Sequence, residues 1–208
     1  MSDAAYGTFT CPQCMTEHQI KLWTSINIAV HPELRKSIET LSYFQFECPN
    51  CGKVSFVLRP CLYLDSANAF LLCFSPDGSI PADVSNVRSL SGYTLRCVKN
   101  PNAFREKVNI LERGLDDRAM ELTKLVLYLQ LERDGLDVVD LVFHSLEQGN
   151  FRFVAVLPNG EEQHITLPPS SYGKFAADVR ELLYTPGNQF SVVDMDWAKE
   201  TLALLYER

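Results

Sequence analysis

Hydrophobic and polar residues alternate along the front of the chain, around two short turns that each carry a pair of cysteines. The alternating hydrophobic residues around the second turn are Phe44, Phe46, Val54, Phe56 and Leu58. Similar strand-like stretches, 8–10 and 19–23, flank the first turn. A period of two is typical of half-buried β-strands. The pattern therefore predicts two β-hairpins, each with a cysteine pair at its tip.

Helical spacing replaces this alternation in the segments that follow each hairpin. Leu34, Ile38 and Leu41 predict a short helix between the two hairpins, because they recur at steps of four and three residues. Asn100 as N-cap and Pro101 in the first turn predict a longer helix, to about residue 113. Strands are expected before it, at 70–74 and 93–98.

A second long helix is predicted from about residue 116 to residue 133. Asp116 and Asp117 stand at its start, where the helix dipole favours anions, so we interpret this acidic pair as capping rather than catalytic. The predicted inward face consists of Leu122, Leu125, Val126 and Leu129. The two helices together predict a helical hairpin.

The last third of the chain returns to short alternating segments. Strands at 138–146, 151–157 and 163–167, separated by glycine-containing turns, predict a three-stranded meander. Two helices are expected after it, at about 171–184 and 194–206. Their predicted inward residues are Phe175, Val179, Leu182, Trp197, Leu204 and Leu205.

These elements predict an α+β protein of two domains. The first, residues 1–134, combines zinc-ribbon-like N-terminal β-hairpins with the helical hairpin. The second, residues 135–208, is a small α+β domain made of the meander and two helices. We place the boundary near Gly135, where a glycine follows the second long helix.

Composition narrows the possible environments and partners of the chain. Its 208 residues carry a net charge of −7, and 46% of them are hydrophobic. Residues 135–208 hold 5 basic and 11 acidic side chains, so this part is a poor nucleic-acid surface. The start of the chain lacks the features of a secretory peptide, and no apolar stretch is long enough to span a bilayer. We therefore expect a cytoplasmic protein, in which seven cysteines serve as metal ligands or buried thiols.

The two cysteine pairs have the spacing of a four-thiolate metal site. Cys11 and Cys14 form one Cys-Pro-x-Cys turn, and Cys48 and Cys51 form the other. Two such turns complete a tetrahedron of thiolates around one ion, and a set with no open position suits a structural Zn²⁺. Iron is the competing metal, and a catalytic dithiol or a disulfide is the competing chemistry.

Residues near these turns leave some details of the site open. Gly52 follows the second pair and supplies a positive φ, whereas Met15 holds the matching place after the first pair. The first turn must therefore close differently or bear strain. His18 is considered as a substitute ligand, although a solvated position or a place beside the ligands is favoured. Cys61, Cys73 and Cys97 lie in apolar stretches and are expected in the core.

Several separated motifs resemble the CpXC family, a prokaryotic family named for its paired Cys-Pro-x-Cys turns. The resemblance covers about residues 7–134. It rests on CPQC at 11–14, Trp23–Asn27, His31–Leu34, CPNCGK at 48–53, Pro60–Asp65 and Arg105–Arg118. It implies metal-binding cysteines at 11, 14, 48 and 51, and it implies no particular reaction. Met15 departs from the glycine that is common at this place in the family.

Three function hypotheses follow. The first is a non-enzymatic interaction module, for protein partners, because the metal site is closed and the sequence carries no phosphate-binding loop, nucleophile elbow or metalloprotease motif. The second is a nucleic-acid-binding zinc-ribbon protein of transcription or RNA processing. Its positive face would combine Lys21, Arg35, Lys36, Lys53, Arg59, Arg88, Arg96 and Lys99. The third is a thiol redox enzyme, which requires an accessible cysteine of low pKa. The pattern indicates no oligomeric state.

Overall fold

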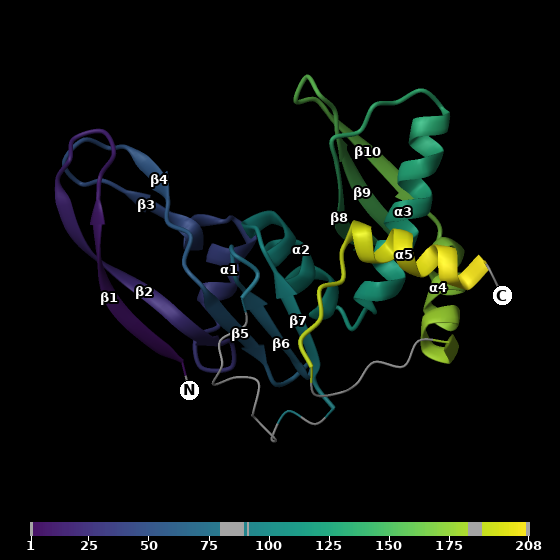
Figure 1. Ribbon diagram of the computed structural model, residues 1–208, viewed down its shortest axis with the longest axis horizontal. Helices are drawn as coiled ribbons and strands as arrows, with labels where there is room; N and C mark the ends of the chain where they lie inside the picture. Colours follow the sequence, from purple (N-terminus) through teal and green to yellow (C-terminus); the bar gives the residue numbers. More distant parts are fainter. Residues whose placement is uncertain (1, 80–89, 91, 183–188, 207–208) are drawn as a thin grey trace. The chain divides into compact units, whose positions relative to one another are not determined.

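The protein is an α+β chain that divides into two compact units (Figure 1). The structure is a computed structural model and describes residues 2–79, 90, 92–182 and 189–206. Unit 1 comprises Met1–Arg105 with Gly187–Ser191, and unit 2 comprises Glu106–Pro186 with Val192–Arg208. This division differs from the predicted boundary near Gly135. The helix that ends at Arg133 packs on the strands that follow it, so both belong to unit 2.

Unit 1 is built on a five-stranded mixed sheet in the order β1-β2-β5-β6-β7. Its strands are β1 (Asp3–Thr10), β2 (Glu17–Asn27), β5 (Cys61–Asp65), β6 (Phe70–Phe74) and β7 (Thr94–Val98). β2 pairs in parallel with β5, and β6 pairs in parallel with β7, whereas the other pairs are antiparallel. The sequence analysis missed β5, a run of five residues whose place in the sheet depends on its pairing with β2 and β6.

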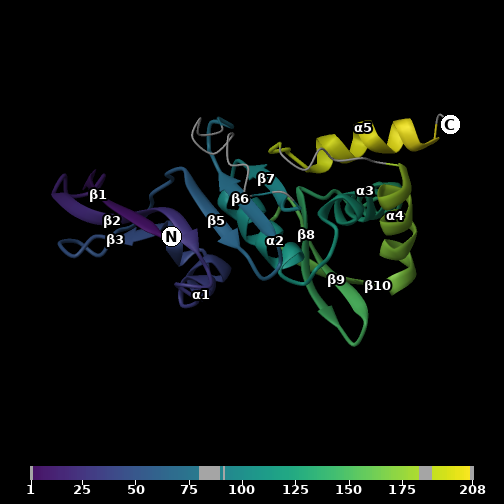
Figure 2. The same cartoon turned by 90° about the horizontal axis from the view of Figure 1, so that it is seen from below.

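The predicted second hairpin is present as a separate two-stranded sheet. β3 (Gln45–Glu47) pairs with β4 (Val54–Phe56) across the second cysteine turn. The short helix α1 (Leu34–Glu39) and the 3₁₀ turn η1 (Ser42–Phe44) connect β2 to β3. Figure 2 shows β1, β2 and β3 side by side. Both predicted hairpins are therefore confirmed, although Phe44 belongs to the 3₁₀ turn rather than to the strand.

An aromatic cluster forms the centre of unit 1. Its members come from four elements and are fully buried or nearly so: Phe44, Tyr63, Phe70, Phe74 and Phe104. Phe44 and Phe74 meet edge to face with centroids 4.9 Å apart, and Phe74 and Phe104 do so at 5.9 Å. Tyr63 and Phe70 are stacked. Edge-to-face pairs add to the free energy of burial. The cluster fastens the second hairpin to the sheet, because Phe44 lies directly before β3.

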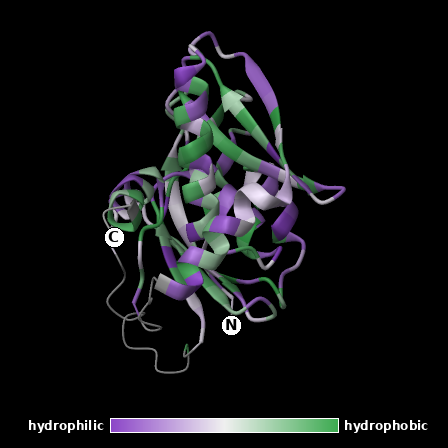
Figure 3. Ribbon diagram, turned by 90° about the vertical axis from the view of Figure 1, so that its right-hand side faces the viewer, coloured by the Kyte–Doolittle hydropathy of each residue, from purple (hydrophilic) through white to green (hydrophobic). Residues whose placement is uncertain are grey.

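Unit 2 packs helices on one face of the predicted meander. α2 (Pro101–Leu111) begins in unit 1 and is followed by α3 (Asp117–Arg133). β8 (Asp140–Glu147), β9 (Asn150–Val156) and β10 (Glu162–Leu167) form an antiparallel sheet in the order β10-β9-β8. α4 (Pro169–Leu182) and α5 (Met195–Tyr206) complete the unit. Hydrophobic and hydrophilic residues alternate along much of the ribbon in Figure 3, as period-two strands and amphipathic helices require.

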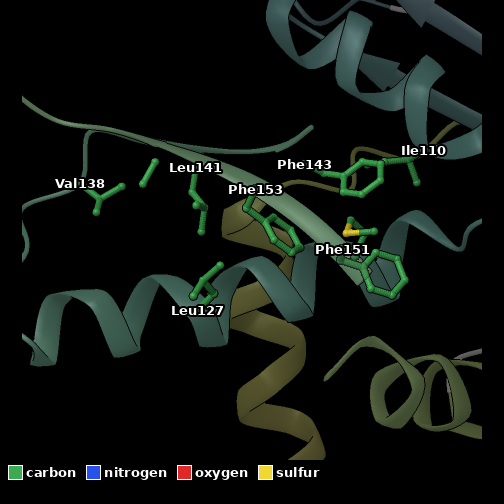
Figure 4. Close-up of a cluster of buried hydrophobic side chains, with 9 residues drawn as sticks. Ile110, Leu127, Val138, Leu141, Phe143, Phe151 and Phe153 are labelled. Atoms are coloured by element: carbon green, nitrogen blue, oxygen red, sulfur yellow. The ribbon is translucent and has the colours of Figure 1, made fainter. Parts of the chain in front are cut away.

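The core of unit 2 lies between α3 and the sheet. Phe143 and Phe153 from the strands meet Leu127 of α3 in this cluster, and all three are buried (Figure 4). A second cluster, of Phe175 and Val179 with Leu125 and Ala198, joins α4 and α5 to α3. α3 therefore packs against other elements on two sides.

This double packing explains where the predicted inward faces are wrong. Leu122 and Leu125 are buried as predicted, whereas Val126 is 42% and Leu129 is 43% exposed. Leu204 of α5 is also exposed. The predicted helix end at residue 184 and the side chain of Leu182 lie outside the described residues. A helix that is covered on two sides has no single apolar stripe, so periodicity alone selects the wrong edge.

Candidate metal centre

The first cysteine turn lies between β1 and β2. Cys11 follows the last residue of β1, and its N–H donates to the carbonyl oxygen of Thr16 at 3.0 Å. The N–H of Met15 donates back to the carbonyl oxygen of Cys11 at 2.9 Å. These two bonds close a tight knuckle that carries the thiols of Cys11 and Cys14.

The second turn repeats this pattern between β3 and β4. The N–H of Cys48 donates to the carbonyl oxygen of Lys53 at 2.9 Å, and that of Gly52 to the carbonyl oxygen of Cys48 at 2.8 Å. Met15 and Gly52 occupy equivalent places, and both have a positive φ, of 58° and 71°. The first turn therefore does not close differently. It closes in the same way and holds a methionine in the left-handed region, which favours glycine.

The two turns bring four sulfur atoms together. The ligand atoms of Cys11, Cys14, Cys48 and Cys51 all lie within 4.8 Å of one another. The Sγ atoms of Cys11 and Cys51 are 3.7 Å apart, and those of Cys14 and Cys48 are 3.6 Å apart. A tetrahedron with metal–sulfur bonds of about 2.3 Å has sulfur–sulfur edges of about 3.8 Å. The donor set therefore fits a single tetrahedral ion.

The same distances do not fit a disulfide. A disulfide requires sulfur atoms about 2.05 Å apart, and all seven cysteines are free thiols. The contacts of Cys11 with Cys51 and of Cys14 with Cys48 also join one turn to the other. The arrangement is that of a metal centre shared by two hairpins.

Side chains next to the sulfur atoms pack between the two hairpins and hold them together. The rings of Phe9 on β1 and Phe46 on β3 meet with centroids 5.2 Å apart. The ring of His18 lies 5.4 Å from that of Phe46, and its Nε2 is 3.3 Å from the Sγ of Cys48. His18 thus contacts a ligand without joining the four-sulfur group, as the favoured sequence interpretation expected. In the tautomer with a proton on Nε2, it donates to the thiolate.

Without a bound metal ion, the surroundings of the four sulfur atoms favour a mixture of protonated thiols and thiolates. Hydrogen bonds involving Asn50 and Thr16 lower the pKa of Cys14 to about 5. A backbone hydrogen bond from Lys53 lowers the pKa of Cys51, but burial and the neighbouring thiols outweigh it and raise this pKa to about 12. Adjacent thiolates repel one another, so full ionisation of the group needs a metal cation.

The other residues singled out in the sequence lie apart from this centre. Cys61, Cys73 and Cys97 are buried in unit 1, at strand positions. Asp116 caps α3 as predicted, because its carboxylate accepts the N–H of Arg118 at 3.0 Å. Asp117 lies in the first turn of α3, as predicted, and it is also buried and pairs with Lys107 at 3.1 Å.

The residues of the predicted positive face do not all reach the surface. Arg96 is buried, and its guanidinium donates to the carbonyl oxygen of Leu95 and the hydroxyl of Ser191. Arg88 lies outside the described residues. The remaining members are exposed: Lys21, Arg35, Lys36, Lys53, Arg59 and Lys99.

A group that the sequence analysis missed lies inside unit 2. Five buried charged side chains form what we call the charge cluster: Glu106, Lys107, Asp117, Glu121 and Lys124. Lys107 Nζ also lies 3.1 Å from Glu121, and Lys124 Nζ lies 2.9 Å from Glu106 and 3.2 Å from Glu121. The carboxylate of Glu106 accepts the N–H of Phe143 at 2.6 Å, which joins α2 to β8.

A pattern in the sequence could have indicated this cluster. Phe104, Lys107, Val108 and Leu111 share one side of α2 at helical spacing, and all four are buried. A lysine inside such an apolar stripe needs a buried partner of opposite charge. Asp117, Glu121 and Lys124 recur at steps of four and three residues on α3, so the partners share one side of the next helix.

The fold and the four-sulfur centre define a protein with a ribbon-type metal-binding unit. The chain belongs to the CpXC protein family, whose model matches residues 9–124, more than half of the sequence. The matched region contains both cysteine turns and ends at the last lysine of the charge cluster. No curated protein and no solved structure matches the chain. In the described part of the chain, no helix combines the length and the apolar character needed to cross a membrane.

Proposed function

We propose that the protein is a zinc-stabilised interaction module that binds protein partners without catalysing a reaction. The four-thiolate set supports Zn²⁺ as the metal, because all its donors are sulfur and it leaves no position for water or substrate. Such a site has a structural role, which here is to hold the two hairpins together. A filled site also leaves these cysteines without a free thiolate for redox catalysis.

Elemental analysis of the purified chain tests the metal. We expect one zinc ion per chain. We expect no bound zinc when Cys48 and Cys51 are both replaced by serine. Iron in the same amount, with the visible absorption of an iron–thiolate centre, would contradict zinc but keep the metal site. A chain purified anaerobically with four reactive thiols and no metal would contradict both.

The observation that carries the interaction role is an exposed apolar row on the second hairpin. We call Val54, Phe56 and Leu58 the ribbon stripe. Val54 and Phe56 are alternate residues of β4 and point to the same face, and Leu58 follows two residues after the strand. The three side chains are 47%, 55% and 44% exposed. Their register partners on β3 are polar, Gln45 beside Phe56 and Glu47 beside Val54.

The opposite face of the same hairpin accounts for the contacts within unit 1. Phe46 points to that face and packs on Phe9 and His18. A small ribbon that packs on one side usually exposes polar residues on the other. Adjacent exposed apolar side chains instead mark surfaces that contact another molecule. The metal centre would then keep the stripe in a fixed shape, which lowers the entropy lost on binding.

Partner capture from the native extract tests this role. We expect protein partners to bind the wild-type chain and to be lost when Val54, Phe56 and Leu58 are replaced by threonine, serine and threonine. The matched control replaces Val139 and Leu204, which are exposed apolar residues of unit 2, with threonine and serine. Both variants must retain one zinc. Equal capture by both variants would refute the stripe as the contact surface.

The same purified chain can be used to test the alternative function, nucleic-acid binding. Two observations weigh against that alternative: Arg96 is buried, and the ring of Trp23 is already in contact with Lys21 at 4.1 Å and with His31 at 4.6 Å. An aromatic ring that stacks on a base needs an open face. Retention on DNA or RNA at low salt, lost as salt rises and weakened by replacing Lys36 and Lys53, would favour the alternative.

A further inference from the structure

Two of the three cysteines outside the metal centre are neighbours across adjacent strands. Cys73 of β6 and Cys97 of β7 are register partners in the parallel pair. Register partners on neighbouring strands project from the same face of a sheet. Cys61 of β5 is the register partner of Phe74, so it projects from the other face. The sheet therefore presents one thiol pair and one separate thiol.

The spacing of the pair suits a covalent link. Neighbouring strands lie about 4.8 Å apart, and disulfides join Cα atoms about 4.4–6.8 Å apart. The two neighbouring thiols shift each other's pKa in opposite directions. Both residues are buried, at 0% and 2% exposed. A bond between them would therefore join two buried side chains on one face of the sheet.

The two thiols differ in their affinity for a proton. The hydrogen bond from Cys73 lowers the pKa of Cys97 to about 7, and the nearby charge of Lys99 acts in the same direction. That hydrogen bond and burial raise the pKa of Cys73. Near neutral pH, a fraction of the chains therefore carries a Cys97 thiolate beside a Cys73 thiol. This is the arrangement in which one sulfur reacts with an oxidant and the second resolves the product.

One member of the pair lies on the edge strand of the sheet, beneath a small cover. β7 is the last strand in the sheet order, and the segment at Ser191 covers it. The backbone contacts are Cys97 N–H to Ser191 O at 3.0 Å and Ser191 N–H to Leu95 O at 3.3 Å. Local opening breaks few bonds where a cover is this small. Hydrogen peroxide, a small uncharged oxidant, is the class of molecule that could enter through such a local opening.

We propose that Cys73 and Cys97 are a redox-sensitive pair, which hydrogen peroxide converts to a reversible disulfide between β6 and β7. The Cys97 thiolate attacks one peroxide oxygen, the O–O bond breaks, and the departing hydroxide takes up a proton to become water. The sulfur of Cys73 then attacks the sulfenic acid of Cys97. The S–S bond forms, the S–O bond breaks, and the hydroxide leaves as water with the Cys73 proton. Two thiols and one peroxide thus yield one disulfide and two waters.

Packing alone is the competing explanation, because a buried cysteine behaves as a small apolar residue. The two explanations differ in what peroxide does to the folded chain. A packed pair stays reduced until the protein unfolds. A redox pair loses two hydrogen atoms while the metal centre remains intact. The inference is separate from the proposed zinc and partner binding, since it involves none of the four metal-site cysteines.

The test uses the full metal-loaded chain, reduced and then treated with hydrogen peroxide in the presence of a metal-sensitive dye. Intact mass is expected to fall by two hydrogen atoms per chain, and peptide mapping to show Cys73 linked to Cys97. The dye should report no metal release, and dithiothreitol should restore the original mass. Cys61→Ser should form the same link, and Cys97→Ser should form none while circular dichroism shows it folded.

Three results would overturn the proposal. The first is a link that involves Cys11, Cys14, Cys48 or Cys51 and comes with metal release. The second is oxygen addition at Cys97 with no link to Cys73. The third is an unchanged mass under conditions in which the unfolded chain is fully oxidised. If Cys97→Ser does not fold, Cys73→Ala serves instead, for which sulfenic acid at Cys97, trapped by a dimedone reagent, supports the proposal and its absence refutes it.

Discussion

The metal centre of unit 1 and the charge cluster of unit 2 both hold separate segments of the chain together, but by different chemistry. Each joins segments that are far apart in the sequence through groups that are costly to bury alone. At the metal centre, the sulfur atoms of Cys14 and Cys48 approach to 3.6 Å. At the charge cluster, Lys124 lies 2.9 Å from Glu106, with both side chains buried.

The difference lies in where the compensating charge comes from. The thiolates need a cation from outside the chain, so their contribution to stability can be removed without a mutation. The carboxylates of the charge cluster are paired with lysines of the same chain, and removing one partner leaves an unpaired charge in the interior. Trp23 lies in unit 1 and Trp197 in unit 2, so the fluorescence of single-tryptophan variants can follow each unit separately.

The largest expected effect is the loss of the metal. Replacing Cys48 with serine should abolish metal binding and unfold the two hairpins, since thiolate sites contribute on the order of 10 kcal/mol to the folds that they close. Trp23 fluorescence, with Trp197 replaced by phenylalanine, should report the change. Cys61→Ser is the control and should keep one metal ion per chain. If Cys48→Ser showed a cooperative unfolding transition like that of the wild-type chain, the hairpins would fold without metal.

A smaller but still large effect is expected from Lys124→Met. This change leaves Glu106 and Glu121 without a shared cation in the interior and should lower the free energy of unfolding by about 3–5 kcal/mol. Urea unfolding followed through Trp197 measures it. Lys199→Met is the matched control, because Lys199 also pairs at i,i+3, with Asp196 at 3.0 Å, but on the surface. The control should change nothing measurable, and equal effects would contradict the difference between buried and exposed pairs.

Single substitutions in the two cysteine turns are expected to change the free energy of unfolding by about 1 kcal/mol. Met15→Gly removes a left-handed strain of about 1–2 kcal/mol, which exceeds the entropy cost of glycine of about 0.5–1 kcal/mol. It should therefore stabilise the metal-loaded chain. Gly52→Ala is the reciprocal change, and it should destabilise by a similar amount although nothing lies within 4 Å of the new methyl group. Denaturant midpoints with zinc in excess measure both, and destabilisation by Met15→Gly would contradict the strain.

The smallest expected effect is the pH dependence of the charge cluster, because two shifts oppose each other. Burial raises the pKa of Glu106 above 4.5, so its contribution to stability is lost as pH rises through that raised value. Burial also acts to raise the pKa of Glu121, but Lys107 and Lys124 hold it below 4.5. Its contribution is present above pH 4.5 and is lost as pH falls through the lowered value.

The stability of unit 2 should therefore pass through a shallow maximum in mild acid. Trp197 unfolding curves at a series of pH values measure it. Glu106→Gln should remove the fall on the neutral side of the maximum and leave the acid side. A wild-type stability that is flat across this range, or a Glu106→Gln curve of unchanged shape, would contradict the assignment of the two shifts.

The parts of this protein that could be predicted from its residues are those with strict local geometry. Two cysteines three positions apart can reach one ion from a single turn, so spacing alone identifies Cys11, Cys14, Cys48 and Cys51 as a group. Asn100 and Asp116 mark helix starts, because a side-chain oxygen that accepts a nearby N–H needs no distant partner. The meander and its turns follow from the same kind of short-range rule.

Long-range pairing decided the rest. β5 became a central strand only because β2 and β6 lie on either side of it, and α3 buries Leu122 and Leu125 only because α4 and α5 pack on them. The charge cluster and the Cys73–Cys97 pair each need two elements in one register, which neither element encodes alone. Local spacing fixes what a turn or a helix end can bind, whereas the partners of a buried charge or thiol depend on the packing of the whole unit.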